Sequence, residues 1–99
     1  MPDNFYGTGR RKSSVARVTI TEGNGKFTFN GKDLEQYFPS PSMKMTIEKP
    51  FKVVSLEGKF DMVVNVNGSG LSAQSDAVAL GISRALIKMD PELRPKLKK

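Results

Sequence analysis

The residues best suited to chemistry lie in a basic run near the N-terminus. Residues 7–14 read Gly-Thr-Gly-Arg-Arg-Lys-Ser-Ser, and Arg17 adds a cation shortly afterwards. Consecutive cations can neutralise successive phosphates, and arginine adds forked hydrogen bonds and stacking on exposed bases. The two glycines would leave the backbone free to follow a nucleic-acid groove. Phe5 and Tyr6, just upstream, could stack on bases or anchor the segment on the core. The candidate nucleic-acid-binding residues of this region are Tyr6, Gly7, Gly9, Arg10, Arg11, Lys12 and Arg17.

A second candidate is the glycine-rich bend Gly68-Ser69-Gly70, which precedes an expected helix. Free backbone N–H groups and the helix dipole favour a phosphate at such a position. Tight turning is the ordinary alternative explanation. No Gly-Lys-Ser or Gly-Lys-Thr follows, so the bend is not a nucleotide P-loop.

Catalysis and metal binding find little support in the composition. The chain has neither cysteine nor histidine, which removes the usual nucleophile–base pairs and the ordinary zinc ligands. The carboxylates are scattered, and no spacing brings two of them reliably into one site. The sequence therefore predicts no enzyme and no cofactor.

The net charge of +6 is concentrated at the two ends of the chain. Residues 1–20 and 86–99 are basic, whereas the stretch between them carries equal numbers of acidic and basic residues. A near-neutral body with basic ends suggests contact with a polyanion, although a solubilising surface is the alternative. No apolar run approaches the roughly 20 residues that cross a bilayer, and the first residues do not resemble a signal peptide. We expect a protein of the cytoplasm or of an organelle, with no membrane contact.

Hydrophobic periodicity predicts the elements that must position these residues. Residues 14–21 alternate as a strand, and residues 26–29 read as its hairpin partner after a turn. Residues 60–66 form the clearest strand, and residues 72–89 a long helix with a buried stripe. Two short helices are expected between them, at residues 33–38 and from an N-cap at Ser42 to near Pro50.

This order of elements predicts one α+β domain, with helices on one face of a mainly antiparallel sheet. The domain covers residues 13–99 and ends in a short basic helix after Asp90 and Pro91. Residues 1–12 are expected to form a basic arm, which is mobile until RNA is present.

The basic run and the motifs that follow it resemble a known family. Residues 6–18 are similar to the N-terminal signature of the ninth small-subunit ribosomal protein, in its bacterial or organellar form. Ordered matches continue nearly to the end of the chain. They include residues 24–26, 30–31, 34–38, 49–50, 60–61, Gly68, Gly70, Gln74, 81–86 and 90–94.

The resemblance implies a fold like the second domain of the fifth small-subunit protein. It implies a structural protein that binds ribosomal RNA in the head of the small subunit, beside neighbouring ribosomal proteins. The RNA contacts it implies are the N-terminal Arg10, Arg11, Lys12 and Arg17, the loop residues Gly68, Gly70 and Gln74, and Arg84 on the following helix.

Two departures from the family pattern narrow these expectations. Ala79 and Leu80 stand where the family usually places a basic residue, often with a second polar one. Leu80 and Ile87 thus form an apolar stripe that could meet a protein neighbour or the terminal helix. Family members also usually continue into a basic tail that reaches transfer RNA, whereas this sequence stops at Lys99, so transfer-RNA contact is not expected of it.

Two other functions fit parts of the pattern. The same fold serves small-molecule kinases and ATPases, and the bend at Gly68 and Gly70 could then hold a nucleotide phosphate. A cationic protein acting outside the ribosome is the other alternative. Specific ATP binding would favour the first, and the absence of small-subunit RNA from bound material would favour the second.

Overall fold

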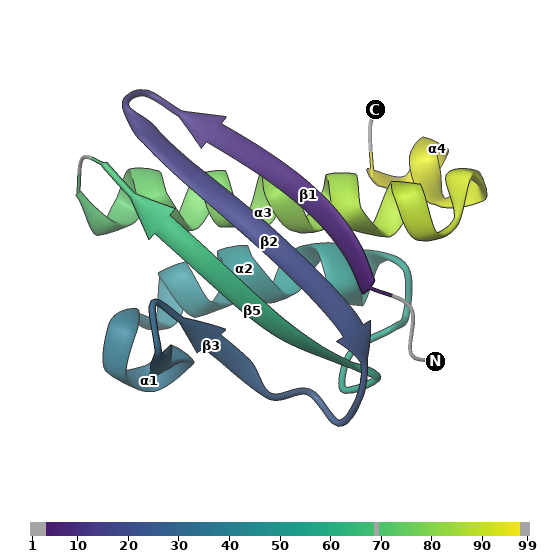
Figure 1. The fold of residues 1–99 in the computed structure, drawn as a ribbon, viewed down its shortest axis with the longest axis horizontal. Coiled ribbons are helices and arrows are strands. Elements are labelled where there is room, and N and C mark those ends of the chain that lie inside the picture. Colours follow the sequence, from purple (N-terminus) through teal and green to yellow (C-terminus); the bar gives the residue numbers. More distant parts are fainter. Residues whose placement is uncertain (1–3, 69, 98–99) are drawn as a thin grey trace.

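The computed structural model describes residues 4–68 and 70–97, which form one α+β unit (Figure 1). A five-stranded sheet in the order β1-β2-β5-β3-β4 is covered on one face by the helices α2 and α3. This confirms the predicted fold class. In chain order the elements are β1 (Asn4–Arg11), β2 (Ser14–Glu22), β3 (Phe27–Phe29), β4 (Lys32–Asp33), α1 (Leu34–Tyr37), α2 (Pro41–Val53), β5 (Phe60–Asn67), α3 (Leu71–Met89), the 3-10 turn η1 (Pro91–Leu93) and α4 (Arg94–Leu97).

The hairpin predicted between residues 14–21 and 26–29 is wrong. Strand β5 lies between β2 and β3, antiparallel to β2 and parallel to β3. The reason is burial, since β5 contributes Met62, Val64 and Val66 to the core and belongs at the centre of the sheet. Asp61 then holds the chain between β2 and β3, because its carboxylate accepts hydrogen bonds from the N–H groups of Asn24 and Lys26, both at 3.0 Å.

Where the structure describes the expected N-terminal arm, it forms strand β1. This strand pairs with β2 along its whole length, from Asn4 opposite Thr21 to Arg11 opposite Ser14. Phe5 packs against the core, which explains why the segment joins the sheet. Residues 1–3 lie outside the described residues. Mobility of this segment without RNA stays a prediction.

The core fills the space between the sheet and the two long helices. Its inward strand residues include Ala16, Val18 and Ile20, as the alternation predicts. Helix α3 contributes the predicted stripe, with Val78, Ile82, Ala85 and Leu86 buried and Met89 partly buried. Among the described residues no helix is long and apolar enough to span a membrane.

Helix α2 differs from its prediction at both ends. It begins at Pro41 with Ser40 as N-cap, because proline suits the first helical turn, where its missing N–H would have no partner. It then continues through Pro50 to Val53. Pro50 removes one helical hydrogen bond, but its ring and the neighbouring Ile47 and Phe51 are buried, and this packing offsets the loss.

Candidate nucleic-acid interface

The two motifs selected from the sequence meet at one end of the molecule. The turn between β1 and β2 lies beside the loop that joins β5 to α3 (Figure 1). Gly68 has a φ of 113°, and a Cβ atom there would collide with the backbone of Ser13 and Ser14. Only glycine permits this approach, so Gly68 lets the loop lie directly against the basic turn.

Lys12 forms the tip of the basic turn with a φ of 57°. A left-handed backbone is uncommon for a residue other than glycine and is strained for a lysine. The side chain is exposed. The turn therefore keeps a cation at its tip at some cost in backbone energy.

The remaining cations of the run divide between the two faces of the sheet. Arg10 points away from the helices, as does Arg17, which stands opposite Thr8 in the register. Because Thr8 and Arg10 are two residues apart on one face, the two arginines are diagonal neighbours. Arg11 points toward α3, where its Nε atom lies 3.7 Å from a carboxylate oxygen of Asp76.

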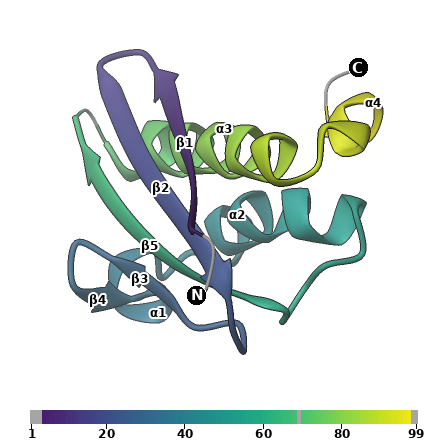
Figure 2. The same ribbon diagram turned by 45° about the vertical axis from the view of Figure 1, so that its right-hand side comes forward.

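Tyr6 extends this cationic surface along the open face of the sheet. Helices α2 and α3 both lie on one side of the sheet and leave the opposite face of β1, β2 and β5 open (Figure 2). Tyr6 is 56% exposed and stands opposite Thr19 on β2, which in turn stands opposite Val63 on β5. An exposed aromatic ring beside arginines is a suitable surface for an unpaired base.

Gly7 and Gly9 have a different role from the one expected. Both are buried against α3, and a Cβ atom on either would collide with the helix backbone at Ala77, Gly81 or Ala85. They therefore allow strand and helix to pack at close range and do not free the backbone for a groove. Arg84 reaches this strand too, and its guanidinium donates a 2.7 Å hydrogen bond to the carbonyl oxygen of Thr8.

Gln74 is buried, and both ends of its amide are engaged. Its Nε2 donates to the carbonyl oxygen of Gly68 at 3.1 Å, and its Oε1 accepts from the Tyr37 hydroxyl at 2.8 Å. Asn30 completes the network, since its Nδ2 donates to Tyr37 Oη at 3.2 Å and to the Val66 carbonyl oxygen at 2.8 Å. Gln74 thus positions the glycine loop from within.

Sequence reasoning missed Asn30, Tyr37 and Asp76 as supports of this end of the molecule. Asn30 has a φ of 51° and precedes a glycine, a pair typical of left-handed turns, so its backbone role had a signal. The hydrogen bonds of Asn30 to β5 could not be predicted from the sequence, because they join segments that are distant along the chain. Gly70 is exposed at the start of α3, and Ser69 lies outside the described residues.

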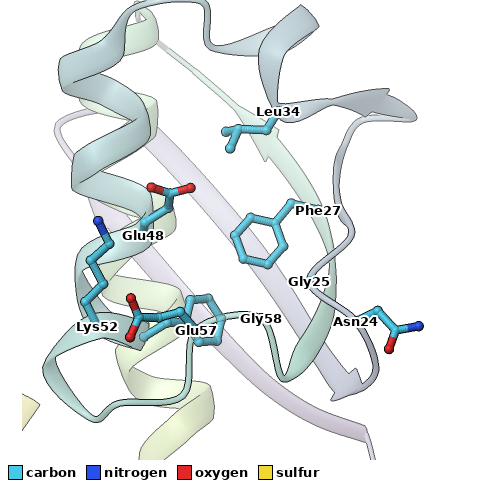
Figure 3. Close-up of a pocket in the computed structure, with 9 residues that line it drawn as sticks. Asn24, Gly25, Phe27, Leu34, Glu48, Lys52, Glu57 and Gly58 are labelled. Carbon is cyan, nitrogen blue, oxygen red and sulfur yellow. The ribbon is translucent and has the colours of Figure 1, made fainter.

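A pocket of about 390 Å³ lies elsewhere, between α2, the turn after it and the chain that leads into β3 (Figure 3). Phe27 and Phe51 lie against each other in its wall, with ring centroids 5.4 Å apart. The pocket is also lined by the charged residues Glu48, Lys52 and Glu57. Within residues 4–68 and 70–97, no cluster of acidic side chains could hold a metal ion.

Together these features define a small basic α+β domain in which cations, an exposed tyrosine and a glycine loop gather at one end. Residues 9–99 match the family described as ribosomal protein S9/S16, and the chain belongs to this family. It is similar to the small ribosomal subunit protein uS9 of Maridesulfovibrio salexigens, with 51% identity over 97 residues. That match covers 98% of this chain and 75% of the relative. The predicted resemblance to the bacterial-type family is confirmed. The alternative prediction, an enzyme that uses a nucleotide, is wrong.

Proposed function

We propose that this chain binds ribosomal RNA in the head of the small subunit through the end where the basic turn meets the glycine loop. As a member of its family, the chain is a structural constituent of the small ribosomal subunit and not an enzyme. Its partners are ribosomal RNA and neighbouring ribosomal proteins. The bacterial relative supports a cytoplasmic ribosome as its location. Contact with transfer RNA is not part of the proposal.

The observation that carries the proposal is the contact of Gly68 with the turn that bears the cations. A strained lysine and two arginines of the β1–β2 hairpin meet the glycine loop there, so two distant parts of the sequence converge. Conformational strain at an exposed basic residue is typical of a functional site. The cations supply phosphate contacts, and the open face beside them suits unpaired bases.

The site residues divide into those that face solvent and those that hold the surface in place. We assign direct contact to the exposed side chains, with Arg11 shared between Asp76 and RNA. Direct contacts are assigned to Tyr6, Arg10, Arg11, Lys12, Arg17 and Arg84, and to the backbone of Gly70. Positioning is assigned to Gly7, Gly9, Gly68 and Gln74.

The test is the salt dependence of binding to a transcript of the small-subunit head. Replacing Arg10, Lys12 and Arg17 with alanine should lower the slope of log affinity against log salt by about two to three, since each lost phosphate contact lowers it by about 0.7–0.9. The matched control replaces the exposed Lys26, Lys32 and Lys59 with alanine and removes the same net charge. Equal slopes for the two triple variants would refute the assignment.

A further inference from the structure

A groove on the helical side of the molecule is not used by the proposed RNA site. It has a volume of about 520 Å³ and lies between α2, α3 and α4. A shallower hollow of about 320 Å³ continues it along α2, and the two share Thr46 and Lys49. The combined surface, which we call the α2–α4 groove, runs from Met45 to Leu97.

The floor of the α2–α4 groove is mainly aliphatic, and Ser42, Thr46 and Ser83 also line the groove. Pro50 and Val53 come from α2, Leu80 from α3 and Leu97 from α4. Met45 is 66% exposed and Val53 is 40% exposed, so α2 leaves two large apolar side chains open to solvent at the two ends of this surface. Leu80 is only half-buried and lies off the buried stripe of α3. The terminal helix thus contributes to the groove without filling it.

The charges around the α2–α4 groove have one sign. Lys49, Lys52 and Lys96 line it, and no acidic residue does so in the described part of the chain. The ion pairs found among the described residues involve Arg11 and Lys44, so these three lysines have no carboxylate partner there. An aliphatic floor with lysines at its rim calls for an occupant that is apolar at its centre and acidic at its edges.

We infer that the α2–α4 groove is a docking site for a protein segment, an amphipathic helix with acidic residues beside its apolar stripe. Protein is favoured over RNA because the described lining holds no aromatic ring and no arginine on which a base could stack. Leucine-type side chains of a helix fit such a floor at i, i+3, i+4 and i+7 spacing, and flanking glutamates would meet the lysines. This inference goes beyond RNA binding and stands on different residues.

The test uses the full chain, labelled with nitrogen-15, and two synthetic helical peptides that share one leucine stripe. One peptide carries glutamates beside the stripe and its twin carries lysines. We expect saturable shifts in the amide resonances of Val53, Leu80 and Leu97 with the glutamate peptide and none with its twin. Lys49→Glu combined with Lys96→Glu should lower the affinity for the glutamate peptide about tenfold or more.

Both lysines are exposed, so their reversal leaves the core intact, and the variant's own spectrum checks its fold. Lys26→Glu combined with Lys59→Glu is the matched control and should bind the glutamate peptide as the parent does. Absence of groove shifts, or equal shifts from the two peptides, would overturn the inference. Groove shifts caused by a single-stranded fragment of head RNA would overturn it as well, in favour of a nucleic-acid surface.

Discussion

Lys12 combines an exposed charge with a backbone conformation that lysine rarely adopts. Its φ of 57° places it in the left-handed region, where a side chain costs about 1–2 kcal/mol relative to glycine. Lys12→Gly should therefore raise the free energy of unfolding by about 1 kcal/mol while lowering the salt slope of RNA binding by about 0.7–0.9. Denaturant unfolding and a salt titration measure the two effects.

The control is Lys12→Ala, which removes the charge and keeps the strain. It should lose the same RNA contact without gaining stability. If Lys12→Gly were less stable than the parent, the strain assigned to this turn would be wrong. If its salt slope were unchanged, Lys12 would not contact phosphate.

Asp61 is expected to make the stability of the protein depend on pH. The N–H groups of Lys26 and Asn24 donate to its carboxylate and hold the pKa of Asp61 below its usual range. A carboxyl whose pKa is lower in the folded state stabilises the fold above its unfolded pKa of about 3.9, and this contribution is lost as pH falls through the folded pKa. Asp61→Asn keeps an acceptor oxygen but cannot titrate.

We therefore expect Asp61→Asn to have a lower Tm than the parent near neutral pH and to lose less Tm on acidification to about pH 3. Thermal unfolding followed by circular dichroism at several pH values measures both differences. Glu57→Gln, at an exposed carboxyl of the turn before β5, is the control. A parallel fall of Tm in Asp61→Asn and parent would show that the hydrogen bonds do not couple stability to pH.

At the scale of elements, local patterns predicted several elements but neither strand β1 nor the way the strands pair. Alternation predicted β2 and β5, and helical spacing predicted α3, because each pattern depends on neighbours in sequence. The place of β5 between β2 and β3 was not predictable in this way, since it is decided by competition for the edge of β2 and for burial. The packing role of Gly7 and Gly9 likewise becomes visible only once α3 lies against β1.

The contact between β1 and α3 should be intolerant of a single added methyl group. A Cβ atom on Gly9 would collide with the α3 backbone at Ala77 and Gly81, which cannot move aside as a flexible side chain could. Gly9→Ala should therefore lower the free energy of unfolding by about 1–3 kcal/mol. Urea unfolding measures this loss. Thr8→Ala, next in the strand but facing away from α3, should cost less than about 1 kcal/mol. Equal losses would contradict the close strand–helix contact.

At the scale of the whole molecule, the candidate site could be predicted only in part. Charge and glycine content drew attention to Arg10, Lys12, Arg17 and Gly68, because those signals are carried by residue type. Which residues support the surface could not be predicted, since Gln74 and Asn30 act through hydrogen bonds between distant segments. Of the residues that line the α2–α4 groove, only Leu80 was singled out from the sequence. The role of the lysines could not be predicted, because they come together only where three helices meet.

The molecule thus presents two surfaces of different chemistry, and their energetics should be separable. The proposed RNA-binding end combines cations with an open sheet face, whereas the α2–α4 groove combines cations with an aliphatic floor. The two surfaces share no residue, and substitutions at sites without common partners usually contribute additively. A double-mutant cycle on RNA binding tests this. The loss of RNA-binding free energy caused by Arg10→Ala with Arg17→Ala should be the same, within about 0.5 kcal/mol, whether or not the chain also carries Lys49→Glu and Lys96→Glu. The reversal of two charges will weaken RNA binding slightly by itself through the long-range field, and this part should vanish at high salt. A coupling that persists at high salt would mean that RNA reaches both surfaces, and the division of the molecule into an RNA side and a protein side would then fail.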